Sequence, residues 1–403
     1  MPIGGAVPPL RAATPARAPH PGRHGGNENK ERATMSATEY PREQAAPAAR
    51  DTPAGTARPV PDGFPGRAIF ATRWGGPEVL RVGEHHVRAP GADEVVVAVR
   101  AAGVAFGDIM LREGLRRDLR PPTIPGYDAA GIVAAVGANV TEMQPGDSVA
   151  VKTPGSTGGY ATHVLAPSWA VVPHPAQLDP AAITSLVLNY VTALQLLTRA
   201  VALADGATIL VHSAAGGVGS ALLQLGALRG MRMFGTASAG KADFVAAQGG
   251  IPIDYRAEDY ARRVRAAAPA GLDAVFDGLG GDSWRGALPL LRPGGHLVIY
   301  GASAGFKNGR RSVPGLLRAV LRAPRTSYLT YFQRGVGVTG YNSDAIIPAR
   351  PDWFRHDLAR LIGLLADGAI APAIHRTFPL ANAAAAQEEL GTGRATGKIV
   401  LRP

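Results

Sequence analysis

Short runs of hydrophobic residues, broken by glycine and proline, mark the chain from about residue 67 to residue 174. The runs are rich in valine, and turn residues such as Pro145-Gly-Asp147 separate them. Candidate strands lie at 94–100, 131–136, 147–151 and 161–165. This pattern predicts a β-rich domain.

Between about residues 181 and 340, strand-like runs alternate with stretches of helical periodicity. A strand at 208–212 precedes a glycine-rich turn and a helix at 217–229. Further strands are predicted at 232–236, 273–276, 296–300 and 335–339, followed by a helix at 353–366 and a strand at 397–401. The alternation is typical of a doubly wound parallel sheet with helices on both faces, so we expect an α/β fold.

The longest uncharged stretch runs from Pro180 to Thr198. Polar residues interrupt it, among them Thr184, Asn189 and Gln195. We therefore expect a helix buried inside the protein or between domains, rather than a membrane span.

Residues 1–66 show no hydrophobic periodicity. They contain 12 Pro, 8 Gly and 13 Ala, a composition that buries too little apolar surface to offset the entropy of ordering the chain. We expect a disordered tail, without the apolar run of a secretory signal, and Met35 is an alternative start.

The chain has no cysteine. This excludes disulfide frameworks, cysteine-ligated zinc, iron–sulfur clusters and thiol nucleophiles. With 46% hydrophobic residues the chain can form sizeable cores, and we expect a cytoplasmic protein.

A net charge of +11 would by itself suggest nucleic acid or anionic membranes as partners. The excess is local, however, because residues 307–350 carry 8 basic residues and 1 acidic residue, whereas residues 67–306 carry 20 and 19. Nucleic acid is not expected, since no recognition fold accompanies the charge.

The basic segment contains a predicted amphipathic helix at 312–323. Its apolar residues follow a helical period, while Arg318 and Arg322 lie four apart on another face. Such a helix can lie on an anionic lipid surface. The alternative is a helix packed near the cofactor or a dimer interface, with its basic face in solvent.

A candidate dinucleotide site lies at Ser213-Ala-Ala-Gly-Gly-Val-Gly219, between the predicted strand and helix. Glycine lets the backbone approach a pyrophosphate and lets the helix pack closely on the strand, and the helix N-terminus offers unpaired N–H groups to the anion. Ala214 stands where the common motif has its first glycine, and an ordinary glycine-rich turn is the alternative. The candidate pyrophosphate-binding residues are Ala215, Gly216, Gly217, Val218 and Gly219.

The second strand of such a domain indicates which coenzyme is bound. An Asp or Glu about 20 residues beyond the motif would accept hydrogen bonds from the ribose of NAD, but no acidic residue lies between Asp205 and Asp243. Ser238 and Lys241 instead offer a hydroxyl and a cation, the groups that a 2′-phosphate requires. We therefore expect NADPH rather than NADH.

The motifs occur in an order that resembles the medium-chain dehydrogenase/reductase superfamily, most closely its zeta-crystallin-like quinone oxidoreductases and their vesicle amine transport protein-1 branch. The resemblance runs from about Arg67 to Pro403. It rests on Gly75-Gly-Pro-Glu-Val-Leu80, Pro125-Gly-Tyr-Asp-Ala-Ala-Gly131, His212-Ser-Ala-Ala-Gly-Gly-Val-Gly219, Asp277-Gly-Leu-Gly-Gly281, Asn189-Tyr-Val-Thr-Ala193 and Gly397-Lys-Ile-Val400.

The resemblance implies a fold and a set of site residues. It implies a GroES-like catalytic domain from residues 67–188 and 342–403, a Rossmann domain at 189–341, and a homodimer. It places the nicotinamide near Thr192, adds Tyr255 to the 2′-phosphate site, and adds Gly301 and Lys398 to the lining of the cofactor site.

The zinc-dependent branches of this superfamily use residues that this chain lacks. At the corresponding positions stand Ala105 and, in Gly126-Tyr-Asp128, Tyr127 with Asp128. These residues do not replace a thiolate and imidazole zinc site. The resemblance therefore implies a zinc-free reductase whose small-molecule acceptors take up hydride readily, such as quinones and α,β-unsaturated carbonyls.

The family's usual Asn and Tyr groups for the acceptor are missing, since Ala105, Met110 and Arg116 stand at those positions. Asp108 is retained, either as an orienting or proton-relaying group or as a helix-capping carboxylate. Arg116 either contacts an anionic acceptor or cofactor phosphate, or is a surface charge. Enoyl-thioester reduction and a weakly catalytic NADPH-binding protein on anionic lipid are the alternatives to quinone or enone reduction.

Overall fold

The computed structural model describes residues 63–116, 118–315, 317 and 328–403. Most of the expected tail, and most of the predicted helix 312–323, lie outside these residues. The last four residues of the expected tail are an exception, because strand β1 (Gly63–Ala71) begins at Gly63 and pairs antiparallel with β2 (Leu80–Arg88) along its length. The expectation of disorder is therefore wrong for residues 63–66. Their local sequence shows no strand pattern, and their pairing with β2 orders them instead.

The β-rich part of the chain forms a seven-stranded sheet in the order β16-β17-β3-β4-β5-β7, with β6 paired to β3. Its central strand is valine-rich, and Val95, Val96 and Val97 are fully buried, as expected for a strand covered on both faces. The strands are β3 (Glu94–Val104), β4 (Asp128–Val136), β5 (Ser148–Lys152), β6 (His163–Pro167), β7 (Val171–Pro173), β16 (Ile374–Pro379) and β17 (Lys398–Arg402).

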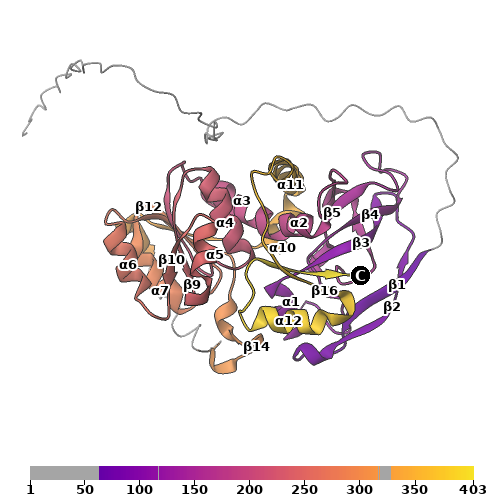
Figure 1. Ribbon diagram of the computed structural model, residues 1–403, viewed down its shortest axis with the longest axis horizontal. Coiled ribbons are helices and arrows are strands. Elements are labelled where there is room, and N and C mark those ends of the chain that lie inside the picture. Colours follow the sequence, from indigo (N-terminus) through magenta and orange to yellow (C-terminus); the bar gives the residue numbers. More distant parts are fainter. Residues whose placement is uncertain (1–62, 117, 316, 318–327) are drawn as a thin grey trace, which may run out of the picture. The chain divides into compact units, whose positions relative to one another are not determined.

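The end of the chain completes this sheet. Strand β17 pairs antiparallel with β3, with Val400 opposite Gly103, and parallel with β16. Helix α12 (Ala383–Gly391) packs against α1 (Phe106–Arg112), so the yellow C-terminal elements of Figure 1 lie among the indigo N-terminal ones. The β-rich domain is thus GroES-like and is assembled from both ends of the described chain.

The middle of the chain forms a six-stranded parallel sheet in the order β10-β9-β8-β11-β12-β15. Helices connect the strands on both faces, as the alternating pattern predicts. The elements are β8 (Thr208–Val211), α4 (Gly217–Leu228), β9 (Arg232–Ala237), α5 (Ala242–Ala247), β10 (Ile251–Asp254), α6 (Tyr260–Ala267), β11 (Leu272–Asp277), α7 (Asp282–Ala287), β12 (Leu291–Ile299) and β15 (Gly337–Gly340).

The strand order of this sheet reverses beside β8. The chain runs from β8 outward to β9 and β10, then crosses to β11 on the other side of β8 and continues to β12 and β15. In an open parallel sheet the crevice at the carboxyl ends of the strands, where the order reverses, is the usual place for a ligand. The sheet is therefore Rossmann-like, and its ligand edge lies at the ends of β8 and β11.

One helical stretch, 180–200, packs between the two sheets' cores. It comprises α2 (Pro180–Ser185), a π-helical turn (Leu186–Tyr190), α3 (Val191–Gln195) and a second π-helical turn (Leu196–Ala200). By length and composition it could cross a membrane, but 83% of its apolar window is buried within the fold. Burial of this extent is typical of a core helix, in agreement with the expected buried helix.

The remaining described elements connect these parts. The helices are α9 (Tyr328–Arg334), α10 (Ser343–Ala349) and α11 (Pro351–Ala366), and two short strands are β13 (Phe306–Lys307) and β14 (Arg310–Arg311). Single 3-10 turns lie at Pro77–Val79, Pro154–Ser156, Ser168–Ala170, Ala239–Lys241, Leu288–Leu290, Ser303–Gly305 and Leu380–Asn382.

Candidate functional site

The glycine-rich turn lies at the carboxyl end of β8 and opens helix α4. Gly216 is the N-cap residue, and no side chain caps the helix, so its first N–H groups remain available to an anion. A Cβ on Gly219 would lie 2.4 Å from the Ser213 carbonyl oxygen, whereas one on Gly216 would meet only that oxygen, at 3.2 Å. Gly219 thus allows helix α4 to pack closely on strand β8. Gly216 leaves the outer side of the turn open, so that a pyrophosphate could approach its backbone.

Two segments distant in sequence border this turn. Gly397 N–H donates to the Ala215 carbonyl oxygen at 2.8 Å, so the start of β17 lies beside it. Gly397 has φ +70°, a conformation that favours glycine. On the other side, the Asn189 amide is so close that a Cβ on Gly217 would lie 2.3 Å from it.

The 2′-phosphate candidates lie together at the end of β9. Strand β9 ends at Ala237, immediately before Ser238, and Tyr255 N–H donates to the Ala237 carbonyl oxygen at 3.3 Å. The Lys241 ammonium donates to the carbonyl oxygens of Gly393 and Ala395 at 2.8 and 2.5 Å. Lys241 thus links this edge of the sheet to the loop that leads into β17.

Thr192 and Gly301 take their positions from different elements. Thr192 is buried in α3 and hydrogen bonds with Tyr341, whose pKa is raised by burial. Gly301 follows β12 at the carboxyl edge of the sheet, and a Cβ there would lie 2.7 Å from the Gly278 carbonyl oxygen. The structure therefore places Gly301 on the expected edge and Thr192 on the buried helix beside Tyr341.

Lys398 lies beside the glycine turn, but its side chain points elsewhere. Its ammonium is buried and forms a 2.7 Å ion pair with Asp128, at the start of β4. A Cβ on Gly103 would lie 2.4 Å from this ammonium and 2.0 Å from the Asp128 carboxylate. Gly103 thus makes room for this buried ion pair, and Lys398 directly follows Gly397, which contacts the glycine turn.

Asp108 has the geometry of a helix cap. Its carboxylate accepts hydrogen bonds from Ala105 N–H and Gly126 N–H, both at 2.8 Å, and from the Tyr160 hydroxyl at 3.0 Å. It is fully buried, and burial raises its pKa to about 7. These contacts favour the capping role over the proton-relaying role, because all three donors belong to the fold.

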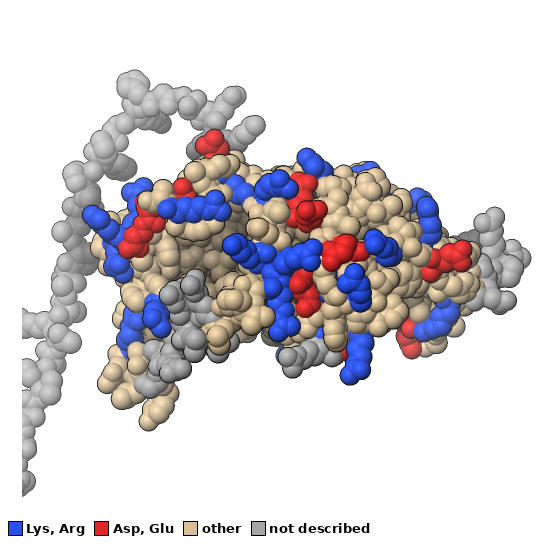
Figure 2. Space-filling view, turned by 90° about the horizontal axis from the view of Figure 1, so that it is seen from below, with Lys and Arg blue, Asp and Glu red and all other residues tan. Residues whose placement is uncertain are grey.

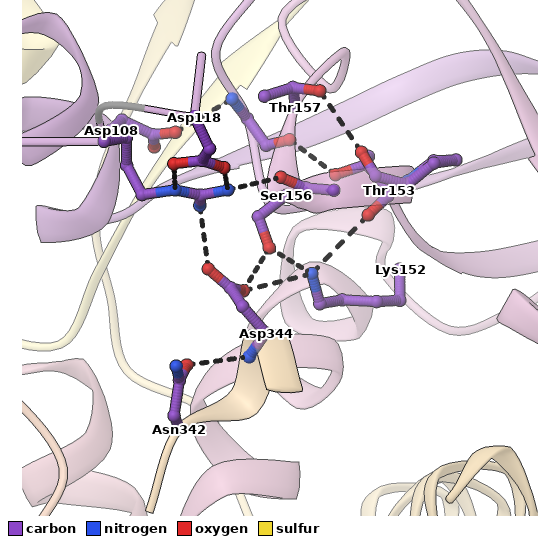
Figure 3. A network of polar contacts seen from close by, with 12 residues as sticks. Asp108, Asp118, Lys152, Thr153, Ser156, Thr157, Asn342 and Asp344 are labelled. Atoms are coloured by element: carbon purple, nitrogen blue, oxygen red, sulfur yellow. Dashed lines mark hydrogen bonds and ion pairs between the residues drawn. The ribbon is translucent and has the colours of Figure 1, made fainter. Parts of the chain in front are cut away.

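A second polar cluster, which local sequence patterns did not reveal, links the end of β5 to helix α10 (Figure 3). The Lys152 ammonium donates to the Ser156 hydroxyl at 2.6 Å, and Ser156 donates to the Asp344 carboxylate. Arg116 donates to the same carboxylate at 2.8 Å and also to Asp118. Arg116 is therefore held by carboxylates and is not an isolated surface charge.

The metal-ligand positions of zinc-dependent relatives do not fit a metal here. Ala105 has no donor atom, and the Asp128 carboxylate is engaged by Lys398. Within the described ranges no group of three or more His, Asp or Glu residues could hold an ion.

Comparisons with known proteins agree with this fold. The "Alcohol dehydrogenase GroES-like domain" family model matches residues 91–176, and the "Zinc-binding dehydrogenase" family model matches residues 241–401. The chain is 32% identical over 344 residues to the human synaptic vesicle membrane protein VAT-1 homolog, covering 84% of this chain and 86% of that protein. It is 35% identical over 341 residues to a Pseudomonas aeruginosa quinone oxidoreductase, covering 84% and 99%.

Among solved structures, Escherichia coli quinone oxidoreductase complexed with NADPH matches with a TM-score of 0.75 at 27% identity, covering 84% of this chain and all of that chain (100%). The chain belongs to the medium-chain dehydrogenase/reductase superfamily. Within it, the chain belongs to the branch that contains the quinone oxidoreductases and the VAT-1-like proteins, as its motifs predict.

Proposed function

We propose that this protein is a zinc-independent, NADPH-dependent reductase of quinones or α,β-unsaturated carbonyls. The observation that carries the proposal is the shared edge of the parallel sheet, where the open glycine turn, Ser238 and Lys241 follow adjacent strands. The NADPH complex of the related E. coli enzyme supports the same coenzyme. Bound NADPH would supply a hydride, and the protein would position the acceptor and exclude water.

Ser238 and Lys241 are the proposed determinants of coenzyme choice. In the structure Lys241 already lies among backbone carbonyls, and burial lowers its pKa. A 2′-phosphate would add an anionic partner to this cation, whereas the 2′-hydroxyl of NADH would not.

Removal of the cation tests the coenzyme proposal. We expect Lys241→Ala to weaken NADPH binding about tenfold or more, because a hydrogen bond to a charged group contributes about 1.5–3 kcal/mol, and to change NADH binding far less. The measurement is a fluorescence titration with each coenzyme. Arg81→Ala, at an exposed position on β2, is the control, and tighter binding of NADH than NADPH by the natural protein would overturn the proposal.

The acceptor class is tested by steady-state oxidation of NADPH with quinones, enones and an enoyl thioester, in the presence and absence of a chelator. We expect turnover with a quinone or an enone and no effect of the chelator. Tight NADPH binding without turnover on any acceptor would contradict the enzyme proposal, and loss of activity on chelation would contradict zinc independence. A dominant rate with the enoyl thioester would identify the alternative substrate class.

A second candidate function is association with anionic lipid through the basic segment 307–350. Val313, Tyr328 and Phe332 are 66%, 85% and 81% exposed, close in sequence to Arg310 and Arg311. On the face drawn in Figure 2, Lys and Arg side chains lie among Asp and Glu side chains in the described part, so the segment itself would have to supply the contact. Co-sedimentation with anionic vesicles tests it, and binding that is absent or unaffected by salt would exclude it.

The homodimer and the cytoplasmic location stay predictions. The first is tested by light scattering of the purified protein, where a monomer mass would contradict it. The second is tested by fractionation of expressing cells.

A further inference from the structure

The loop 392–397 belongs to the β-rich domain, because it joins helix α12 to strand β17. Its Gly393 and Ala395 carbonyl oxygens accept hydrogen bonds from the Lys241 ammonium, at 2.8 and 2.5 Å. Lys241 stands 152 residues before Gly393, at the start of α5 in the Rossmann-like domain. The contact therefore ties the two domains together close to the end of β9, where the 2′-phosphate is predicted.

The other end of the loop contacts the glycine turn. Gly397 N–H donates to the Ala215 carbonyl oxygen at 2.8 Å, and Gly397 forms a parallel bridge with Gly216. A Cβ on Gly397 would lie 2.1 Å from the Ala373 carbonyl oxygen, so the chain is closely packed at this point. The loop thus borders the predicted pyrophosphate turn as well as the predicted 2′-phosphate site.

The two halves of the loop are held differently. In the second half Ala395 is buried, and Thr396 N–H donates to His375 Nδ1 at 3.4 Å, a contact within the β-rich domain. In the first half Gly393 and Arg394 are exposed. The Lys241 ammonium is the group that links this exposed half to the Rossmann-like domain.

The Lys241 ammonium has the capacity to bind an anion while it holds the loop. An ammonium has three N–H donors, and among the described residues two carbonyl oxygens accept from it. Burial lowers the pKa of Lys241, and the positive charge of Arg256 lowers it further. A phosphate here would take the third donor and offset the repulsion between the two cations.

We propose that the loop 392–397 takes part in coenzyme selection: a 2′-phosphate held by Lys241 also fastens this loop, and with it the β-rich domain, to the Rossmann-like sheet. This inference rests on the proposed function. The loop has a positioning role, because its carbonyl oxygens hold the ammonium where the phosphate would bind. NADH, which lacks the phosphate, would leave the loop less firmly held.

The coupling between loop and phosphate acts in both directions, because a coupling free energy between two sites is reciprocal. A loop in its place should improve NADPH binding, and bound NADPH should stabilise the loop. A change that displaces the loop should therefore weaken NADPH binding more than NADH binding, even where it leaves the Lys241 side chain intact.

Gly393 offers a way to displace the loop. It follows the last residues of α12 with φ +69°, a conformation that alanine adopts only with strain, and an added Cβ would meet nothing within 4 Å. Gly368 is the matched control, since it follows α11 in the same way, with φ +70° and equally open surroundings.

Fluorescence titration with each coenzyme compares the two variants. We expect Gly393→Ala to weaken NADPH binding about threefold or more and to change NADH binding by less than about twofold, in the range of couplings between contacting residues. Gly368→Ala should change neither. Equal losses with NADPH and NADH, or an unchanged NADPH affinity in Gly393→Ala, would overturn the inference.

A double-mutant cycle with Lys241→Ala separates the loop contact from a general loss of stability. Without the ammonium, Gly393→Ala should weaken NADPH binding no further, because the loop acts through Lys241. Circular dichroism establishes that each variant folds. Losses that simply add in the double variant would show that loop and cation act independently and would overturn the inference.

Hydrogen exchange of the natural protein supplies a readout that needs no loop variant. With saturating NADP⁺ we expect the amides of 392–397 to exchange at least about threefold more slowly than with saturating NAD⁺, and Lys241→Ala should abolish this difference. Equal exchange with both bound coenzymes would overturn the inference and leave NADPH-dependent reduction standing. Tighter binding of NADH than NADPH by the natural protein would contradict the inference and the proposed function together.

Discussion

Lys398 and Asp128 form a buried ion pair between the last strand and β4, 270 residues apart in sequence. Both side chains are buried, and one oxygen of Asp128 has no hydrogen-bond partner. Desolvation of such a pair is costly, and removal of one partner leaves the other charge uncompensated. Substitution of either residue alone should therefore destabilise the folded protein.

We expect Lys398→Met to lower the free energy of unfolding by about 3–5 kcal/mol, because Asp128 would lose its charge partner. The double variant with Asp128→Asn should lose less, since no charge remains buried. Urea unfolding measures both. Arg88→Met, which breaks the exposed pair with Glu94, should cost at most about 1 kcal/mol, and equal losses in the single and double variants would contradict this assignment.

Asp108 should leave a signature in the pH dependence of stability. Burial raises the pKa of the folded group to about 7 from 3.8, so between these values the folded state holds a proton that the unfolded state releases. The free energy of unfolding should therefore fall as pH rises from about 4 to 7, by up to about 1.4 kcal/mol per pH unit for this single group.

Asp108→Asn should flatten this fall in urea titrations at several pH values. Asp93→Asn, at an exposed position before β3, is the control and should keep the slope of the natural protein. An unchanged slope in Asp108→Asn would show that the carboxyl titrates alike in both states.

At the level of elements, the packing of α4 on β8 depends on Gly219. A Cβ there would meet backbone atoms of Ser213 and Ala214 at 2.4 to 2.8 Å, and backbone cannot give way as a flexible side chain does. The helix would have to move away from the strand and would displace the turn that is predicted to hold the pyrophosphate.

We expect Gly219→Ala to weaken NADPH binding at least tenfold and to lower thermal stability. Gly363→Ala is the matched control, because Gly363 lies in α11, where a Cβ meets nothing within 4 Å, and should raise stability by about 0.5–1 kcal/mol. Fluorescence titration and thermal unfolding measure the two effects. Normal NADPH affinity in Gly219→Ala would contradict the role assigned to the turn.

The elements differ in how far the sequence predicts them. Hydrophobic periodicity and turn residues locate β3, β8, α4 and β17 to within a few residues. The reason is that a strand or helix with buried positions repeats its apolar residues at a regular spacing along the sequence. Strands β1 and β16 are missed, since their stability comes from partners distant in the chain: β1 pairs with β2, and β16 with β17. Local pattern carries no information on such partners.

At the scale of the whole molecule, the candidate site combines segments that sequence reasoning could and could not find. The glycine turn and the Ser238–Lys241 edge are local features and were predicted. The Lys152, Ser156 and Asp344 cluster was not, because Ser156 and Asp344 lie 188 residues apart and no short motif connects them. Lys398 is predicted to line the cofactor site from its motif position, and its ion pair with Asp128 is a contact that only the fold reveals.

Two contacts link segments that are distant in the chain. Asp344 contacts Arg116 and Ser156 of the β-rich domain, and Gly397 donates to Ala215 of the glycine turn. We therefore expect hydride transfer to depend on both domains, since the segment at the start of β17 contacts the glycine turn of the Rossmann-like sheet.

Transfer of isotope from coenzyme to product tests whether the protein passes a hydride from NADPH to its acceptor. NADPH carrying deuterium at both positions of C4 would be oxidised by the protein with an enone, and the reduced product examined by mass spectrometry and NMR. With labelled NADPH in ordinary water, we expect one deuterium on the carbon β to the carbonyl. With unlabelled NADPH in deuterated water, we expect no deuterium on that carbon. An unreduced enone, or a product whose β-carbon hydrogen comes from solvent, would contradict the account.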